Sequence, residues 1–495
     1  QVSEDAGATW RKIGGFPGID ERAYVSHLAA SQHDVNTVYA SFDNHKMADF
    51  KPYILKSGDR GRTWKAIAGD LPDNGTVWDI TEDHVNSALL FAGTEFGVFF
   101  SIDGGAKWVQ LKAGLPTIAV KDLAIQQREN DLVLGTFGRS FYVLDDYSTL
   151  REISSELLEK DAHIFPVKEA LMYIEATHRG IHSQGETFFA SKNPPYGATF
   201  TYYVKDGLET LKAERKKNEK KLRKEGQTPP YPDWETLRAE DEEVKPYLLF
   251  TIRDVTGNVV RKLQAPGKKG IQRITWDLRY AGRSPVSKNS KVNAAAALLA
   301  MPGLYTVELS KVVRGVESTL AGPVTFSTRI LNNSSLPAED RAALATFHQH
   351  VAELQRATLG VQKYADELAG RLSLIDKAIQ ITPEAGPDIA GQFKDVNRRV
   401  ELVRRKLNGD QSISKRNGNQ RRAIAGRIQY LVYFIYRSTS APALQHQEEA
   451  EHIRTDLMPI IQELRALGEI DLHTLETQLE QLRAPWTPGR LPELR

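Results

Sequence analysis

The chain contains no cysteine among its 495 residues, which excludes a disulfide framework, a zinc–thiolate site and a cysteine nucleophile. Long apolar runs are also missing, since the longest, 294–301, is far too short to span a bilayer. Neither sign of charge dominates: the formal net charge is +2, which gives no general argument for nucleic acid or an anionic membrane as a partner. The first residues, Gln1–Asp5, lack a basic and apolar leader, so we expect no signal peptide within this chain.

What is present is the composition of a globular protein, with 41% apolar and 26% charged residues. The length suggests about three domains of ordinary size. We therefore expect a chain that can bury a sizeable core in more than one folded part.

An eight-residue pattern, Ser-x-Asp-x-Gly-x-Thr-Trp, occurs three times near the start of the chain, with Lys107 replacing Thr in the third copy. Repetition at a regular interval predicts an architecture of repeated units. The repeated positions are Ser3, Asp5, Gly7 and Trp10, then Ser57, Asp59, Gly61 and Trp64, then Ser101, Asp103, Gly105 and Trp108.

The residue types in this pattern suit a tight turn. Asp and Ser side chains can bond to backbone groups a few residues away, and Gly adopts conformations that a Cβ would obstruct. The Trp would bury a large apolar area, which we expect to lie against a neighbouring repeat. We interpret Asp5, Asp59 and Asp103 as turn-forming residues; a catalytic or metal-binding role is the alternative.

The pattern resembles the Asp-box of sialidase-like and sortilin-like β-propellers, which implies one four-stranded blade for each copy. Strand-like openings begin at Val25, Val77 and Val120, about 50 and about 40 residues apart, which suits blades of four short strands. The resemblance predicts blades over 24–67 and 77–111 and a third from Val120 that has no Asp-box. We assign 1–147 to the C-terminal blades of a propeller.

The first Asp-box lies at the very start of the chain, although such a box normally comes late in a blade. We therefore expect the chain to be a fragment or a processed product of a longer protein. Three blades cannot close a ring without leaving sheet edges and faces exposed. The missing N-terminal part of the propeller or another polypeptide is expected to complete it.

The segment Gly135–Asp146 resembles the closing blade of large bacterial proteins with sortilin-type propellers, the Asp-box or BNR repeat proteins often labelled glycosyl hydrolases. Phe137 stands where those proteins usually carry His, so the resemblance implies no role for a histidine at this position. The final segment Ala484–Arg490 is similar to the usual terminus of the family. The resemblance implies a bacterial protein that is secreted, periplasmic or at the cell surface.

After a connecting segment, 148–196, strand-like runs predict a β-sandwich over 197–330. Trp276 and the run Pro302–Val307 resemble the Ig-like module of the flagellar hook-capping protein. A densely charged insertion, 206–245, is basic in its first half and acidic in its second, which predicts an exposed helical hairpin. A docking arm for a partner is the alternative interpretation of this insertion.

From 331 to 495 the apolar residues follow the 3–4 spacing of helices, for example from Leu344 to Ile379 and from Ile389 to Leu407. Ser335 and Pro337 suit the start of the first helix, and two more helices are expected near 420–437 and 447–467. We therefore predict an antiparallel helical bundle. The predicted fold class is multidomain and mainly β, a partial Asp-box propeller and an Ig-like sandwich, followed by this α-helical bundle.

No metalloprotease helix, phosphate-binding loop or nucleophile elbow occurs in the chain. His178 and His182 have ligand-like spacing, but Gly180 between them argues against a helix, so no metal site and no cofactor is expected. Glycoside hydrolysis needs paired carboxylates across a cleft. The weak candidates on expected channel-lining strands and nearby turns are Asp79, Glu95, Asp122 and Arg139.

Two hypotheses of function follow. The favoured one is a non-enzymatic binding or scaffold protein that uses its propeller and Ig-like domain to bind protein or peptide partners within a larger assembly, which can include a membrane complex. The alternative is a glycoside hydrolase, sialidase- or glucanase-like, with a cleft in the propeller. Neither hypothesis involves nucleic acid.

Overall fold

A computed structural model describes residues 1–112, 114–175, 191–291, 298–331, 338–492 and 494. The chain divides into two compact units, Gln1–Phe165 with Tyr203–Lys205, and Pro166–Tyr202 with Asp206–Arg495. His178, His182, Ser335 and Pro337 lie outside the described residues. Antiparallel β-sheets occupy most of the chain up to Ile330, and a helical region follows.

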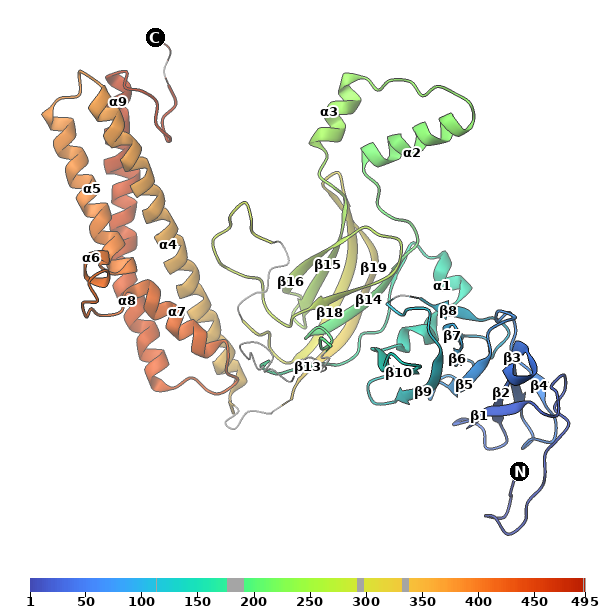
Figure 1. The fold of residues 1–495 in the computed structure, drawn as a ribbon. Helices are drawn as coiled ribbons and strands as arrows, with labels where there is room; N and C mark the ends of the chain where they lie inside the picture. The colour runs from blue at the N-terminus through green and yellow to red at the C-terminus, as the bar shows by residue number, and fades with distance from the viewer. Residues whose placement is uncertain (113, 176–190, 292–297, 332–337, 493, 495) are drawn as a thin grey trace. The chain divides into compact units, whose positions relative to one another are not determined.

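Three antiparallel sheets make up most of the first unit (Figure 1). In each sheet the strands are neighbours in the order in which they occur along the chain. The first sheet comprises β1 (Tyr24–Ala30), β2 (Val38–Asn44), β3 (Asp49–Ser57) and β4 (Lys65–Ala66). The second comprises β5 (Val77–Glu82), β6 (Leu90–Thr94), β7 (Gly97–Ser101) and β8 (Val109–Leu111), and the third β9 (Val120–Gln126), β10 (Asp131–Thr136) and β11 (Phe141–Leu144). The predicted openings at Val25, Val77 and Val120 thus lie in the first strand of each sheet.

The first strands β1, β5 and β9 lie side by side, so the second sheet is stacked between the other two. One of its faces packs on Tyr39 and Ile54 of the first sheet. The other packs on Leu123 and Leu134 of the third sheet. Because both faces are covered, β6 and β7 are buried at every position and are apolar except for the final Thr94 and Ser101.

Buried polar groups also join the sheets. Glu82 of the second sheet accepts the Tyr39 hydroxyl of the first, with 2.7 Å between the oxygens. On the other side, Asp83 accepts the Tyr147 hydroxyl at 2.7 Å and two N–H groups of Arg151 at 2.7 and 2.9 Å. Burial opposes the charge of Asp83, but Arg151 and Tyr147 outweigh it and lower the pKa of this carboxyl group. A carboxylate that is fully buried therefore stays ionised and ties the second sheet to the segment after the third.

The first unit ends with short elements after the third sheet. These are η2 (Ser148–Glu152), α1 (Ser155–Glu159) and β12 (Ala162–Ile164). Ser154 caps the N-terminus of α1, and its side chain accepts the backbone N–H of Leu157.

The second unit begins with a β-region. A five-stranded sheet has the order β13-β19-β18-β15-β16, antiparallel except where β13 runs parallel to β19. Strands β14 and β17 are neighbours in a separate sheet. The core of this region is aromatic, with Trp276 fully buried and its ring 5.1 Å from that of Tyr305. The strands are β13 (Ala170–Met172), β14 (Ala198–Val204), β15 (Tyr247–Asp254), β16 (Val259–Pro266), β17 (Gly270–Trp276), β18 (Gly303–Val313) and β19 (Val316–Ile330).

The charged insertion contains two helices, α2 (Leu211–Lys224) and α3 (Trp234–Glu242). Thr210 and Asp233 cap their N-termini through side-chain oxygens. Arg215 of α2 bonds Glu240 of α3 through two N–H groups at 2.5 and 2.8 Å. An ion pair therefore joins the basic and the acidic helix of this hairpin.

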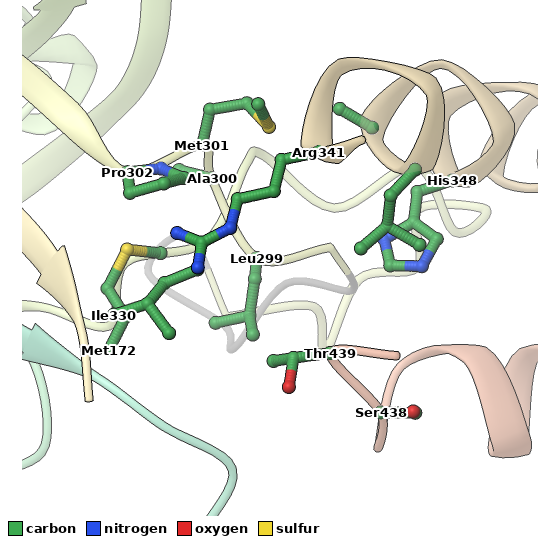
Figure 2. Close-up of a pocket in the computed structure, with 12 residues that line it drawn as sticks. Met172, Leu299, Ala300, Met301, Pro302, Ile330, Arg341, His348, Ser438 and Thr439 are labelled. Atoms are coloured by element: carbon green, nitrogen blue, oxygen red, sulfur yellow. The ribbon is translucent and has the colours of Figure 1, made fainter. Parts of the chain in front are cut away.

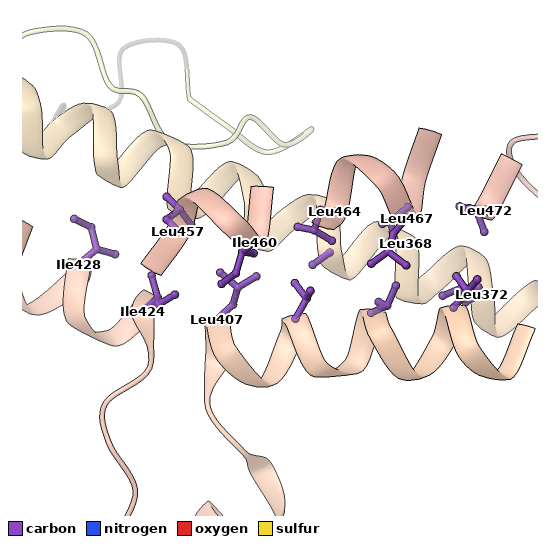
Figure 3. Close-up of a cluster of buried hydrophobic side chains, with 14 of the residues drawn as sticks. Leu368, Leu372, Leu407, Ile424, Ile428, Leu457, Ile460, Leu464, Leu467 and Leu472 are labelled. Carbon is purple, nitrogen blue, oxygen red and sulfur yellow. The ribbon is translucent and has the colours of Figure 1, made fainter. Parts of the chain in front are cut away.

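The helical region comprises α4 (Arg341–Ile381), α5 (Pro387–Asn408), α6 (Gln411–Ser414), α7 (Ile424–Ile435), α8 (Leu444–Ala466), η3 (Leu467–Asp471) and α9 (Leu472–Gln481). Apolar side chains from all of these elements except α6 form one core, as Figure 3 shows for Leu368, Leu372 and Leu407. The 3–4 spacing predicted this core because such residues share one face of a helix. Among the described residues, none of the helices has the length and apolar character needed to cross a membrane.

Candidate functional site

The candidate site lies at one end of the three stacked sheets of the first unit. In an antiparallel sheet the start of strand one and the turn between strands two and three lie at the same end. The pairs Val77–Thr94 and Thr94–Gly97 show this for the second sheet, and Val120–Thr136 shows it for the third. The side chains gathered there, called the first-strand cluster below, are His27, Trp78, Asp79, Glu95, Lys121 and Asp122.

Trp78 connects two sheets within the cluster. Its indole N–H donates to Glu95 Oε2 at 2.9 Å, and Nζ of Lys121 lies 2.9 Å from the centre of its ring. Lys121 Nζ is also 3.7 Å from Glu95 Oε2. Burial lowers the pKa of Lys121, and Glu95 partly opposes that shift. A cation on an indole face beside a carboxylate is a stable arrangement, because the ring quadrupole and the negative charge both attract it.

Asp79 is fully buried and joins all three sheets. Its Oδ2 accepts the backbone N–H of Leu123 at 2.6 Å, and its Oδ1 lies 3.0 Å from Nδ1 of His27. This contact raises the pKa of His27, with a smaller contribution from Asp122. Both carboxylate oxygens of Asp79 therefore make contacts between the sheets. Asp122, its equivalent in the third sheet, is exposed.

Arg139 lies in the exposed turn between β10 and β11, two residues before Phe141. The structure therefore brings Glu95 together with Lys121, and Asp79 together with His27. Around them this end of the sheets exposes apolar side chains on strand starts and turns, namely Tyr24, Met47, Phe50, Phe96 and Phe137. Exposed apolar groups beside charged ones are typical of an interaction surface.

The three Asp-boxes form near-identical hydrogen-bonded turns. Ser3, Ser57 and Ser101 each donate to the Asp of their own box at 2.8 Å. Each Asp also accepts a backbone N–H four residues later, at 2.8, 2.8 and 2.9 Å. The hydroxyl and the N–H of Thr9 lower the pKa of Asp5 to about 2. Such a carboxylate is ionised at neutral pH, and its oxygens accept the hydrogen bonds that hold the turn together.

The tryptophans of the boxes differ in environment. Trp108 is buried, and its indole N–H donates to the Ile67 carbonyl of the preceding repeat at 3.0 Å. Trp64 packs against Phe16, with 5.3 Å between the ring centres. The expectation that the ring is buried is wrong for Trp10, which is 61% exposed. Within the described residues no preceding sheet lies against Trp10, so its N–H bonds only the Gly7 carbonyl of its own turn, at 3.1 Å.

The second unit contains a small apolar cavity of about 50 Å³, shown in Figure 2. Met172, Leu299 and Ile330 contribute to its wall, together with Arg341 and His348 of α4. Burial lowers the pKa of His348 to about 4, so its imidazole is neutral at pH 7. Ligand sites for small molecules usually enclose ~300 Å³ or more, so this cavity has room for only a few water molecules.

Sequence reasoning missed His27, Trp78 and Lys121 in the cluster, and it missed the Asp83–Arg151 pair. Trp78 and Lys121 hold equivalent repeat positions, one after the opening Val of each sheet, which could have drawn attention to them. No comparable signal marks Asp83 and Arg151, because they are 68 residues apart. Within the described ranges, no group of three or more His, Asp and Glu side chains is placed to hold a metal ion.

Comparison with known proteins gives no family for the chain. No family model matches it, and no curated protein matches it. Among solved structures, it is similar to the extracellular domain of BT4673 from B. thetaiotaomicron, described as a one component system, with 14% identity and a TM-score of 0.20 over 63% of this chain and 31% of that one. It is also similar to the GH74 xyloglucanase from Xanthomonas campestris, with 13% identity and a TM-score of 0.21 over 60% of this chain and 38% of that one.

The chain spans about a third of the length of these solved structures. Their TM-scores are too low for either similarity to support an argument about fold or function.

Proposed function

We propose that the protein is a non-enzymatic binding or scaffold protein that holds a protein or peptide partner at the first-strand cluster. The observation that carries this proposal is the combination of Trp78, Lys121 and Glu95 with exposed aromatic residues at one end of the stacked sheets. Aromatic anchors surrounded by charged groups are the usual composition of sites that bind proteins.

The proposal includes the architecture that the sequence suggests. The three stacked sheets would be blades of a sortilin-like Asp-box propeller, and the β-region of the second unit an Ig-like module. The stacking of first strands β1, β5 and β9 supports the blade interpretation, because first strands line the channel of a propeller. Export from a bacterial cell and assembly into a larger complex belong to the same proposal.

A glycoside hydrolase is the second candidate. It is favoured by the placement of an indole ring beside a carboxylate, Trp78 beside Glu95, with the exposed Asp122 on the adjoining strand. Hydrolysis would need two carboxyl groups on opposite sides of one sugar bond. Asp79 is unsuited to that role because it is fully buried, accepts the Leu123 N–H and lies 3.0 Å from Nδ1 of His27.

The experiment that separates the two functions measures binding and turnover with the same variants. Trp78→Ala should weaken capture of a peptide selected from a displayed library by ~10-fold or more, since aromatic anchors that become buried on binding contribute ~2 kcal/mol or more. Lys121→Ala should weaken the same capture, because it removes the cation that covers the Trp78 ring. Val85→Ala, a change in an exposed turn outside the cluster, is the matched control. Hydrolysis of a polysaccharide or sialoside that is lost in Glu95→Gln would refute the scaffold function and support the enzyme.

A further inference from the structure

Helix α7 carries apolar side chains on two of its faces. The face toward α4, α5 and α8 lies in the core of the helical region and consists of Ile424, Ile428, Leu431 and Ile435 (Figure 1). The face turned away from that core exposes aromatic rings, since Tyr430, Tyr433 and Phe434 are 51%, 52% and 41% exposed. A helix at a protein surface normally has polar residues opposite its core face. Packing among the described residues therefore does not account for these three rings, called the aromatic stripe below.

The rings of the aromatic stripe form one continuous surface. Phe434 contacts both tyrosines, with its ring centre 4.5 Å from that of Tyr430 and 5.3 Å from that of Tyr433. The imidazole of His446, from α8, stacks on Phe434 with 6.4 Å between the ring centres and 22° between the ring planes. Rings held in place by such contacts lose little conformational freedom when a partner binds. The stripe is therefore a preorganised surface.

Arginine side chains lie over the two tyrosines of the stripe. The guanidinium carbon of Arg422 is 4.5 Å from the ring centre of Tyr430, and that of Arg437 is 4.3 Å from the ring centre of Tyr433. Arg437 also donates an N–H to the Tyr433 hydroxyl at 3.2 Å. Within the described ranges neither arginine forms an ion pair. Both guanidinium groups can therefore accept a carboxylate from outside the chain.

The sequence around α7 carries charge of one sign. From 411 to 447 the chain has six Lys and Arg residues and no Asp or Glu, although the whole chain contains 65 basic and 63 acidic residues. The basic residues that precede α7 are all exposed, and they are Lys415, Arg416, Arg421 and Arg422. A positive surface selects a negative partner through complementary charge, and the paired N–H groups of a guanidinium match the two oxygens of a carboxylate. The partner chemistry that fits this face is therefore acidic.

We propose that the aromatic stripe binds an acidic segment of a partner protein. Carboxylate groups of the partner would pair with Arg422 and Arg437, and an apolar side chain between them would cover Phe434. Aromatic residues and Arg are enriched at the centres of protein interfaces. Burying the hydroxyl groups of Tyr430 and Tyr433 among lipid chains would cost hydrogen bonds, which favours a protein over a membrane. This inference concerns the helical region and does not depend on the function proposed for the first-strand cluster.

Selection from a random peptide library displayed on phage tests the proposal with the full chain. Peptides are selected on the wild-type chain and then depleted on Arg422→Glu/Arg437→Glu, which removes peptides that bind elsewhere, including the first-strand cluster. The peptides that remain should combine Asp or Glu with apolar residues, and their affinity should fall ~10-fold or more in Phe434→Ala. Lys363→Glu/Arg465→Glu makes the same change of charge at exposed positions of α4 and α8 and should keep the wild-type affinity. A library in which no peptide distinguishes the wild type from Arg422→Glu/Arg437→Glu, or in which the distinguishing peptides lack carboxylates, would overturn the proposal.

Two further measurements exclude other causes of the same result. Arg422→Gln/Arg437→Gln removes the charges without reversing them and should also weaken the selected peptides, while equal hydrogen-exchange protection of α4 in this variant and the wild type shows that the helices remain folded. Flotation with vesicles of phosphatidylserine and phosphatidylcholine distinguishes a membrane from a protein partner. Wild-type chain that floats with these vesicles, and that no longer floats as Arg422→Gln/Arg437→Gln, would identify an anionic membrane as the occupant and refute the protein partner.

Discussion

The sheets of the first unit and the helices of the second are held together in different ways. Between the sheets, buried polar groups make directional bonds, as Asp83 does with Arg151 and Tyr147. Between the helices, an apolar core that includes Leu372 and Leu407 makes the contact at the centre, and ion pairs such as Arg427–Glu449 join the helices beside it. Directional bonds specify one register, whereas aliphatic packing tolerates changes of shape at constant volume. The two regions should therefore respond differently to substitution.

The largest effect is expected at Asp83. Replacing Asp83 by Ala leaves the guanidinium of Arg151 and the Tyr147 hydroxyl without their shared partner, and breaking a buried pair in this way costs ~3–5 kcal/mol. Hydrogen exchange should show faster exchange in the second and third sheets, while the helical region is unchanged. Asp73→Ala, at an exposed position, is the control; unchanged protection in Asp83→Ala would show that the sheets do not depend on this pair.

A somewhat smaller effect is expected in the helical core. Leu372 is fully buried, so Leu372→Ala should destabilise the helices by ~3 kcal/mol through lost burial and the cavity left behind. Leu372→Met keeps the volume and should cost less than ~1.5 kcal/mol. The protection of backbone amides in α4 and α5 from hydrogen exchange measures the loss of stability in both variants. Leu402→Ala, at a partly exposed position, is the control. Equal losses for Ala and Met at position 372 would contradict the view that Leu372 stabilises the helices through its buried volume.

The hydrogen bond between Tyr39 and Glu82 should contribute less to stability than either Asp83 or Leu372. Tyr39→Phe keeps the ring but leaves Glu82 without the hydroxyl donor 2.7 Å from its Oε1, and a hydrogen bond to a charged group contributes ~1.5–3 kcal/mol. The same change at the exposed Tyr24 should have no measurable effect. Local exchange rates in β2 and β5 measure the difference, and identical rates in the two variants would mean that the first and second sheets stack without this bond.

The smallest effect is the pH dependence that His27 confers. Contact with Asp79 raises the pKa of His27 above its ordinary value of 6.5, so protonation stabilises the folded state. That contribution is fully present below the unfolded pKa and is lost as the pH rises through the folded pKa. An NMR titration should give a midpoint above pH 6.5 for His27. His27→Gln should remove this part of the pH dependence from the stability of the first unit. A midpoint at or below 6.5 would exclude a stabilising ion pair.

Several elements follow from sequence pattern alone. The repeat predicted where β1, β5 and β9 begin, and the 3–4 spacing predicted helices close to α4, α5, α7 and α8. These features are local, because a turn, a strand or one face of a helix is encoded within a few neighbouring residues. The catalytic candidates were less predictable, since Asp79 and Asp122 look equivalent in sequence but only Asp79 is buried.

The amino-acid sequence by itself determined the periodicity of this protein: Asp-box turns such as Ser57–Trp64, short strands between them, and amphipathic helices toward the C-terminal end. Tertiary structure alone decided which repeated positions are covered and which partners meet. Asp79 reaches Leu123 and His27, and Asp83 reaches Arg151, across 44 to 68 residues. The reason is physical: each repeat encodes the same two faces, and whether a face is buried depends on what stacks against it.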